Sequence, residues 1–121
     1  MKEFDLKSRT KQFALRIIKL FRSLPKSSDA QVIGKQILRS GTSVGAQYRE
    51  ACRSRSDSEL ISKMASSLQE LDETAYWLEL LVEGDFIKAE KLVDLQDETE
   101  QLIAIFVASL NAGEAFNLHF T

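Results

Sequence analysis

The chain has 121 residues with one proline, five glycines and 28% charged residues, a composition typical of long helices and unlike that of sheet proteins, which are rich in turn residues. Its length suits one domain, residues 1–121, and no stretch of about 18 apolar residues is present, so we expect no membrane span and no membrane partner. The single cysteine, Cys52, excludes an internal disulfide and favours a reducing, cytoplasmic compartment.

The net charge of −2 hides a division between the two halves of the chain. Residues 1–63 contain 14 Lys or Arg and 6 Asp or Glu, a net charge of +8, whereas residues 64–121 contain 2 and 12, a net charge of −10. This asymmetry indicates either a basic surface for nucleic acid or complementary surfaces that pair within a helical bundle or oligomer.

Apolar residues recur at three- and four-residue steps in the basic half of the chain, which predicts two helices. The first is expected at about residues 5–24, and Pro25 ends it because the residue before a proline is pushed out of the helical region. The second is expected at about residues 29–54, with Ser28 as N-cap and Gln31 completing a capping box.

The acidic half predicts two further helices. One covers about residues 57–83, with Gly84 as its C-cap. The other covers about residues 88–112 and ends at Gly113, leaving an apolar tail, 113–121, that either frays in solvent or docks on a neighbouring subunit. The third segment carries a heptad-like seam of Met64, Leu71 and Leu78, with a second row of Leu68, Ala75 and Val82.

Four helices of this length, joined by connections of a few residues, must pack antiparallel to their neighbours in sequence. The sequence therefore predicts an all-α, up-down-up-down four-helix bundle.

The stretch of residues 39–57 supports two interpretations, because it places glycines, hydroxyl residues and arginines inside a helical pattern. A DNA-reading helix–turn–helix would need a break near Gly41. The apolar spacing instead continues through that position, and Gly34, Gly41 and Gly45 share one side of a continuous helix. Each glycine costs an exposed helix about 1 kcal/mol relative to alanine, a loss that close packing of a neighbouring helix can offset. We therefore expect one unbroken helix.

The same stretch resembles the signature of the bacterial four-helix bundle proteins, also called ribosomal-RNA intervening-sequence proteins. The resemblance rests on Leu24-Pro25, Asp29, the run from Ile37 to Ala51, Arg55-Ser56-Asp57, Glu70-Leu71-Asp72-Glu73-Thr74 and Trp77-Leu78-Glu79-Leu80-Leu81. It covers about residues 13–107. Gln47-Tyr48-Arg49-Glu50-Ala51 resembles the subgroup with a Tyr-Arg-Glu-Ala ending, in which asparagine is usual at position 47.

The resemblance implies a left-handed bundle that assembles into a ring, most simply a homopentamer, with no defined biochemical activity. A related branch, the accessory protein of diversity-generating retroelements, is similar in fold and ring assembly and binds nucleic acid and a reverse transcriptase. The positions that carry the motif, and with it the expected helix packing, are Arg39, Ser40, Gly41, Ser43, Val44, Gly45, Ala46, Arg49 and Glu50.

The residues give little material for catalysis, and we expect no enzyme, no metal and no cofactor. The only histidine, His119, lies in the tail, so a di-iron site of the Glu-x-x-His kind has no ligands. Cys52 has no nearby base and is interpreted as a buried structural cysteine. Glu70, Glu73, Glu79 and Glu83 are interpreted as a solvated acidic face.

Two functions stay open. The first is a non-enzymatic, self-assembling scaffold or interaction module, with copies of itself and possible protein partners bound. The second is a nucleic-acid-binding accessory protein that uses the basic half to bind RNA or DNA phosphates. The candidate nucleic-acid contacts are Lys11, Arg16, Lys19, Arg22, Lys35, Arg49, Arg53 and Arg55.

Overall fold

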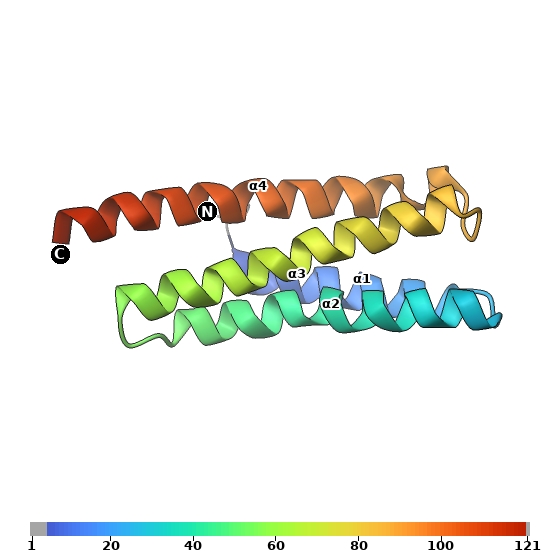
Figure 1. Ribbon diagram of the computed structural model, residues 1–121, viewed down its shortest axis with the longest axis horizontal. Coiled ribbons are helices and arrows are strands. Elements are labelled where there is room, and N and C mark those ends of the chain that lie inside the picture. The colour runs from blue at the N-terminus through green and yellow to red at the C-terminus, as the bar shows by residue number, and fades with distance from the viewer. Residues whose placement is uncertain (1–4, 121) are drawn as a thin grey trace.

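The computed structural model describes residues 5–120, and the side chains of residues 5–112. Four helices make up this part of the chain, which contains no strand: α1 (Leu6–Ser23), α2 (Ser28–Cys52), α3 (Asp57–Glu83) and α4 (Ala89–Phe120) (Figure 1). The α2 helix is continuous through Gly41, so the helix–turn–helix interpretation is wrong and the unbroken helix is confirmed.

Helices that are consecutive in the chain lie side by side (Figure 1). The α1–α2 and α3–α4 connections are at one end of the bundle, and the α2–α3 connection is at the other. Contacts between α1 and α4 are far fewer than those between consecutive helices. The four helices therefore form an all-α bundle that is packed most loosely along the α1–α4 seam.

Local signals explain where most helices begin and end. The Asp5 side chain accepts a hydrogen bond from the Ser8 amide at 3.2 Å, and α1 ends before Pro25 as expected. The Ser56 hydroxyl caps α3 by accepting from the Glu59 amide at 3.1 Å. Because capping residues satisfy amides that have no partner within the helix, they fix these boundaries.

The capping box expected at the start of α2 is wrong. Ser27, not Ser28, is the N-cap, and it makes no side-chain capping bond. A hydrogen bond from Ser27 instead lowers the pKa of Asp29, and the Gln31 amide donates to the Pro25 carbonyl oxygen at 2.8 Å. Ser28 is therefore already inside the helix, and the Gln31 side chain is bound to Pro25 and not to the N-cap amide.

Gly84 is the C-cap of α3, as expected, but it does not have the left-handed conformation that usually selects glycine there. Its φ is −85°, whereas the next residue, Asp85, has φ 64°. A Cβ on Gly84 would lie 2.9 Å from both the Leu80 carbonyl oxygen and the Phe86 ring. Glycine is therefore needed at this position for space.

The expected end of the last helix at Gly113 is also wrong, since α4 continues to Phe120. One glycine costs a helix only about 1 kcal/mol, and the residues that follow include no proline. The helix therefore has no strong reason to end there. The side chains of the apolar tail, and with them the expected docking on a neighbouring subunit, lie outside the described residues.

The core lies between the four helices and follows the heptad pattern. Met64, Leu71 and Leu78 are all buried, which confirms this seam of α3. The row of Leu68 and Val82 is partly buried and packs against the core. The other large core side chains are Leu6, Phe13, Ile17, Leu20, Leu24, Ile37, Val44, Leu81, Leu92, Leu95, Leu102 and Phe106.

Candidate functional site

The glycine-lined side of α2 lies against α1. A Cβ added to Gly41 would lie 2.7 Å from Ile17 Cγ1 and 2.8 Å from its Cγ2, closer than side chains tolerate. A Cβ on Gly34 would lie 2.6 Å from Leu24 Cδ1, and one on Gly45 would lie 3.0 Å from Thr10 Oγ1. These glycines therefore let two helices of one chain approach closely, as the spacing predicts.

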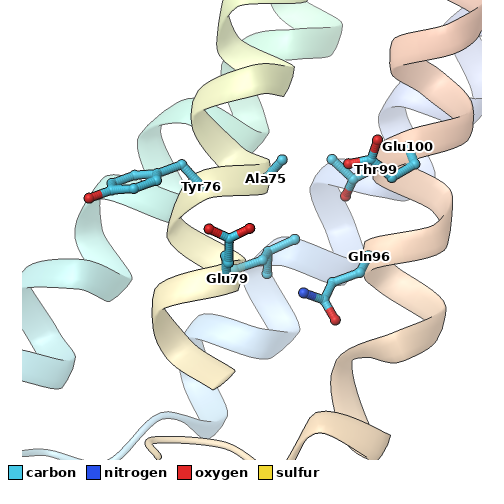
Figure 2. A pocket seen from close by; sticks show the side chains of 7 residues that line it. Ala75, Tyr76, Glu79, Gln96, Thr99 and Glu100 are labelled. Atoms are coloured by element: carbon cyan, nitrogen blue, oxygen red, sulfur yellow. The ribbon is translucent and has the colours of Figure 1, made fainter. Parts of the chain in front are cut away.

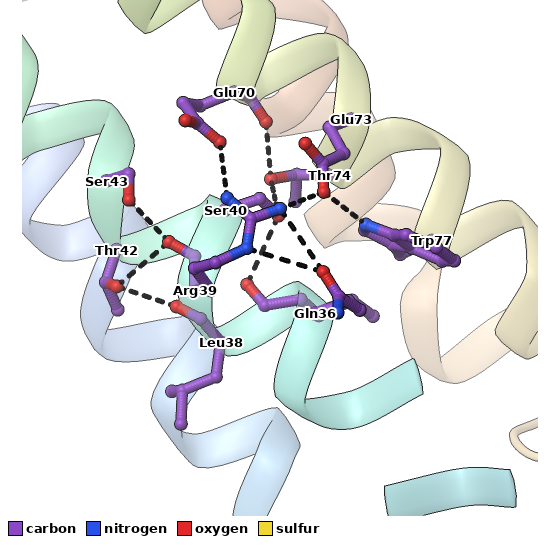
Figure 3. A network of polar contacts seen from close by, with 11 residues as sticks. Gln36, Leu38, Arg39, Ser40, Thr42, Ser43, Glu70, Glu73, Thr74 and Trp77 are labelled. Carbon is purple, nitrogen blue, oxygen red and sulfur yellow. Dashed lines mark hydrogen bonds and ion pairs between the residues drawn. The ribbon is translucent and has the colours of Figure 1, made fainter. Parts of the chain in front are cut away.

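A second side of α2 is joined to α3 by buried hydroxyls. Ser40 Oγ and Thr74 Oγ1 are 2.8 Å apart, and the Ser67 hydroxyl donates to the Val44 carbonyl oxygen at 2.7 Å (Figure 3 shows the first pair). Ser40, Ser67 and Thr74 are fully buried. Because buried polar groups stabilise only when they are hydrogen-bonded, these contacts fix how α2 and α3 are placed along each other.

Arg39 is the centre of a polar cluster on the same side of the bundle (Figure 3). Its guanidinium binds Glu73 and, at 3.3 Å, Glu70, while Gln36 Oε1 accepts from its Nε at 3.4 Å. The Trp77 indole donates to the same Glu73 carboxylate at 3.0 Å. The expectation that Glu70 and Glu73 belong to a solvated acidic face is therefore wrong, because both are partly buried and both pair with this arginine of α2.

The other motif positions are exposed or form hydrogen bonds at the surface of the bundle. The Ser43 hydroxyl donates to the Arg39 carbonyl oxygen at 2.7 Å, which is how a hydroxyl is tolerated within a helix. Ala46 and Arg49 are exposed. Glu50 accepts from Lys63 Nζ at 2.8 Å, and this hydrogen bond raises the pKa of Lys63. The motif thus combines helix packing, made by the glycines and by Ser40 and Val44, with an exposed polar edge.

The eight candidate nucleic-acid contacts are all exposed, on α1, on α2 and in the connection that follows α2. Within the described residues, none of the eight takes part in an ion pair. By contrast, Arg9 binds Glu98 of α4 at 2.6 Å and Arg39 binds α3. Two arginines of the basic half, Arg9 and Arg39, therefore pair with the acidic helices. The eight candidate contacts form a positive surface that is available for binding.

A pocket of about 280 Å³ opens between α3 and α4 (Figure 2). The carboxylates of Glu79 and Glu100 and the amide of Gln96 line it, over Ala75 and Leu78. Glu79 and Glu100 are exposed and form no ion pair among the described side chains. Reasoning from the sequence missed this pocket, although the heptad spacing of α3 places Ala75 and Glu79 beside its core face.

Cys52 is exposed, so its interpretation as a buried structural cysteine is wrong. It follows the last buried residue of α2, Ala51, and it lines an apolar pocket of about 240 Å³ with Tyr48 and Met64. Burial, together with a hydrogen bond to Cys52, raises the pKa of Tyr48 to about 12. No histidine, lysine, arginine or carboxylate side chain lines this pocket beside Cys52, and the described residues include no group of three side chains able to hold a metal ion. The imidazole of His119 lies beyond the described side chains.

The helices described in the structure are not long and apolar enough to cross a membrane. With its buried hydroxyl contacts and glycine-mediated packing, the structure defines an all-α four-helix bundle protein. A model of the 23S rRNA-intervening sequence protein family matches residues 2–108, and the chain belongs to this family.

A solved structure supports this assignment at the level of the fold. A protein of unknown function of the S23 ribosomal protein family, from Bacteroides thetaiotaomicron VPI-5482, is 35% identical to the chain. The match covers 92% of this chain and 99% of that chain, with a TM-score of 0.84. No curated protein matches the chain.

Proposed function

We propose that the chain is a non-enzymatic scaffold or interaction module of the cytoplasm that assembles with copies of itself into a ring of five. In this proposal each copy is one domain with a left-handed, up-down-up-down arrangement of its helices. The assembly, and not a reaction, would present the surfaces that bind other molecules.

One observation carries the proposal: charges of opposite sign are left without partners on different helices of the same chain. The cations of α1 and α2 other than Arg9 and Arg39 are exposed and form no ion pair with a described residue, and the same is true of Glu79 and Glu100 between α3 and α4. Large apolar side chains are exposed beside them, including Leu15 on α1 and Tyr76 on α3. Surfaces that are complementary in this way support association between copies.

The test is the mass of the full chain in solution, measured by light scattering across a concentration and salt series. We expect a multiple of the 13.7 kDa chain mass at micromolar concentration, with a population of smaller species that grows as salt screens the charges. A mass of one chain at every concentration would contradict self-assembly.

A second candidate function is nucleic-acid binding, because so many exposed cations lack an acidic partner in the described part of the chain. Arg49, Arg53 and Arg55 gather at the end of α2 and in the connection to α3. In a ring, several copies of this cluster would add their contributions to phosphate binding.

Binding of a labelled RNA duplex and a DNA duplex, followed by mobility shift, tests the second candidate. We expect binding at low salt that weakens steeply as salt rises, and a shallower salt dependence in Arg53→Ala/Arg55→Ala. Lys26→Ala, which removes an exposed cation at the other end of α2, is the control and should change binding less. Absence of binding at the lowest salt would exclude this function.

A further inference from the structure

α1 carries an exposed leucine among exposed cations. Leu15 is 49% exposed, with Lys11 one turn before it, Lys19 one turn after it and Arg22 seven residues after it. Residues four and seven apart lie on one face of a helix. None of the three cations forms an ion pair with a described residue. We name these four residues the α1 outer face.

The pocket between α3 and α4 has the opposite charge and a similar apolar content. Glu79 and Glu100 flank it, and Tyr76, 53% exposed, lies beside it on α3 with its ring turned away from α4 (Figure 2). Val93 and Val107, 48% and 40% exposed, lie seven residues before and after Glu100 on α4. This spacing is the seam along which a further helix packs. We name Tyr76, Glu79, Val93, Gln96, Glu100 and Val107 the α3–α4 groove.

We propose that the α1 outer face of one copy packs into the α3–α4 groove of the next copy. This inference rests on the proposed self-assembly and specifies its interface. Leu15 would pack over the apolar part of the pocket, made by Ala75 and Leu78, and the ammonium groups of Lys11 and Lys19 would bind the two glutamates. Their aliphatic stems would lie along the apolar floor of the pocket.

The separation of the two surfaces determines the kind of assembly. The two surfaces are made by different helices, the first by α1 and the second by α3 and α4. A symmetric pair of α1 outer faces would bring cations against cations. Contact between unlike surfaces is heterologous, and such contacts repeat from copy to copy until a ring closes.

The interface is tested by reversing charges on one surface and then on both. Lys11→Glu/Lys19→Glu and Glu79→Lys/Glu100→Lys are each expected to raise the dissociation constant between copies by about 100-fold. The chain that carries all four substitutions restores opposite charges across the interface. Its dissociation constant is expected to be at least about tenfold lower than that of either double variant. Lys26→Glu/Lys35→Glu, with the same change in net charge at exposed positions elsewhere, should leave assembly close to that of the wild type. Mass is read by light scattering, and helix content by circular dichroism.

The outcomes separate this interface from self-assembly itself. If the wild-type chain assembles and the folded charge-reversal variants have the same mass, the proposed interface is wrong. The proposal of self-assembly is then unaffected. Failure of the fourfold variant to regain mass while both double variants dissociate also contradicts it. A monomeric wild-type chain contradicts both. If a double variant does not fold, Leu15→Ser at its exposed position replaces it and should weaken assembly by about tenfold or more.

Discussion

At the scale of single residues, the turn between α3 and α4 depends on a conformation that few side chains adopt. Asp85 has φ 64°, the only positive φ of a non-glycine residue in the described part of the chain. The left-handed region costs most residues roughly 1–2 kcal/mol, and aspartate tolerates it better than branched residues do. Asp85, and not Gly84 with its φ of −85°, therefore adopts the left-handed conformation of this turn.

We expect Asp85→Val to lower the free energy of unfolding by about 1–2 kcal/mol and Asp85→Gly to leave it unchanged or raise it slightly. The measurement is urea unfolding followed by circular dichroism. Lys88→Val, at an exposed position with negative φ in the same connection, controls for the added apolar side chain. Equal stability of the two valine variants would show that the turn does not depend on this conformation.

At the scale of helices, the glycines of α2 determine the distance to α1. Ile17 is branched at Cβ and fully buried, so it has little freedom to move away from a new side chain at position 41. We expect Gly41→Leu to lower the free energy of unfolding by several kcal/mol, and Gly45→Leu, against Thr10, by a similar or smaller amount. The four carbon atoms of the leucine side chain cannot be accommodated without separating the helices.

Thermal unfolding and the mass in solution together check this expectation. Ala46→Leu introduces the same side chain at an exposed position of the same helix and should change stability by less than about 0.5 kcal/mol. Full stability and unchanged mass of Gly41→Leu would show that α1 does not lie against this glycine.

The sequence was sufficient to predict the helices and the side of α2 that packs closely against another helix. Both predictions rest on patterns, the apolar periodicity and the glycine spacing, that are repeated over many residues. It was not sufficient for the start of α2 or the end of α4, where alternatives such as Ser27, Ser28 and Gly113 differ by only about 1 kcal/mol. The pairing of Arg39 with α3 and the α3–α4 groove depend on how neighbouring helices are rotated relative to each other. That rotation follows from packing between helices and not from the pattern within one.

At the scale of the whole molecule, the division of charge along the sequence becomes a division of charge between faces. Arg9 and Arg39 bind carboxylates of α4 and α3, and these few exposed or partly exposed pairs account for little stability. Apart from these pairs and Lys63–Glu50, the exposed charges form no ion pair within the described residues, and exposed apolar side chains lie among them. An isolated copy would leave both surfaces in water, whereas assembly brings them together.

The measurement that tests this account most directly is native mass spectrometry of the full chain at micromolar concentration. Five copies of the 13.7 kDa chain in one closed species, falling to single copies in Lys11→Glu/Lys19→Glu, are the expected result. A wild-type chain that remains a single copy under these conditions would contradict the self-assembly on which the proposed function depends.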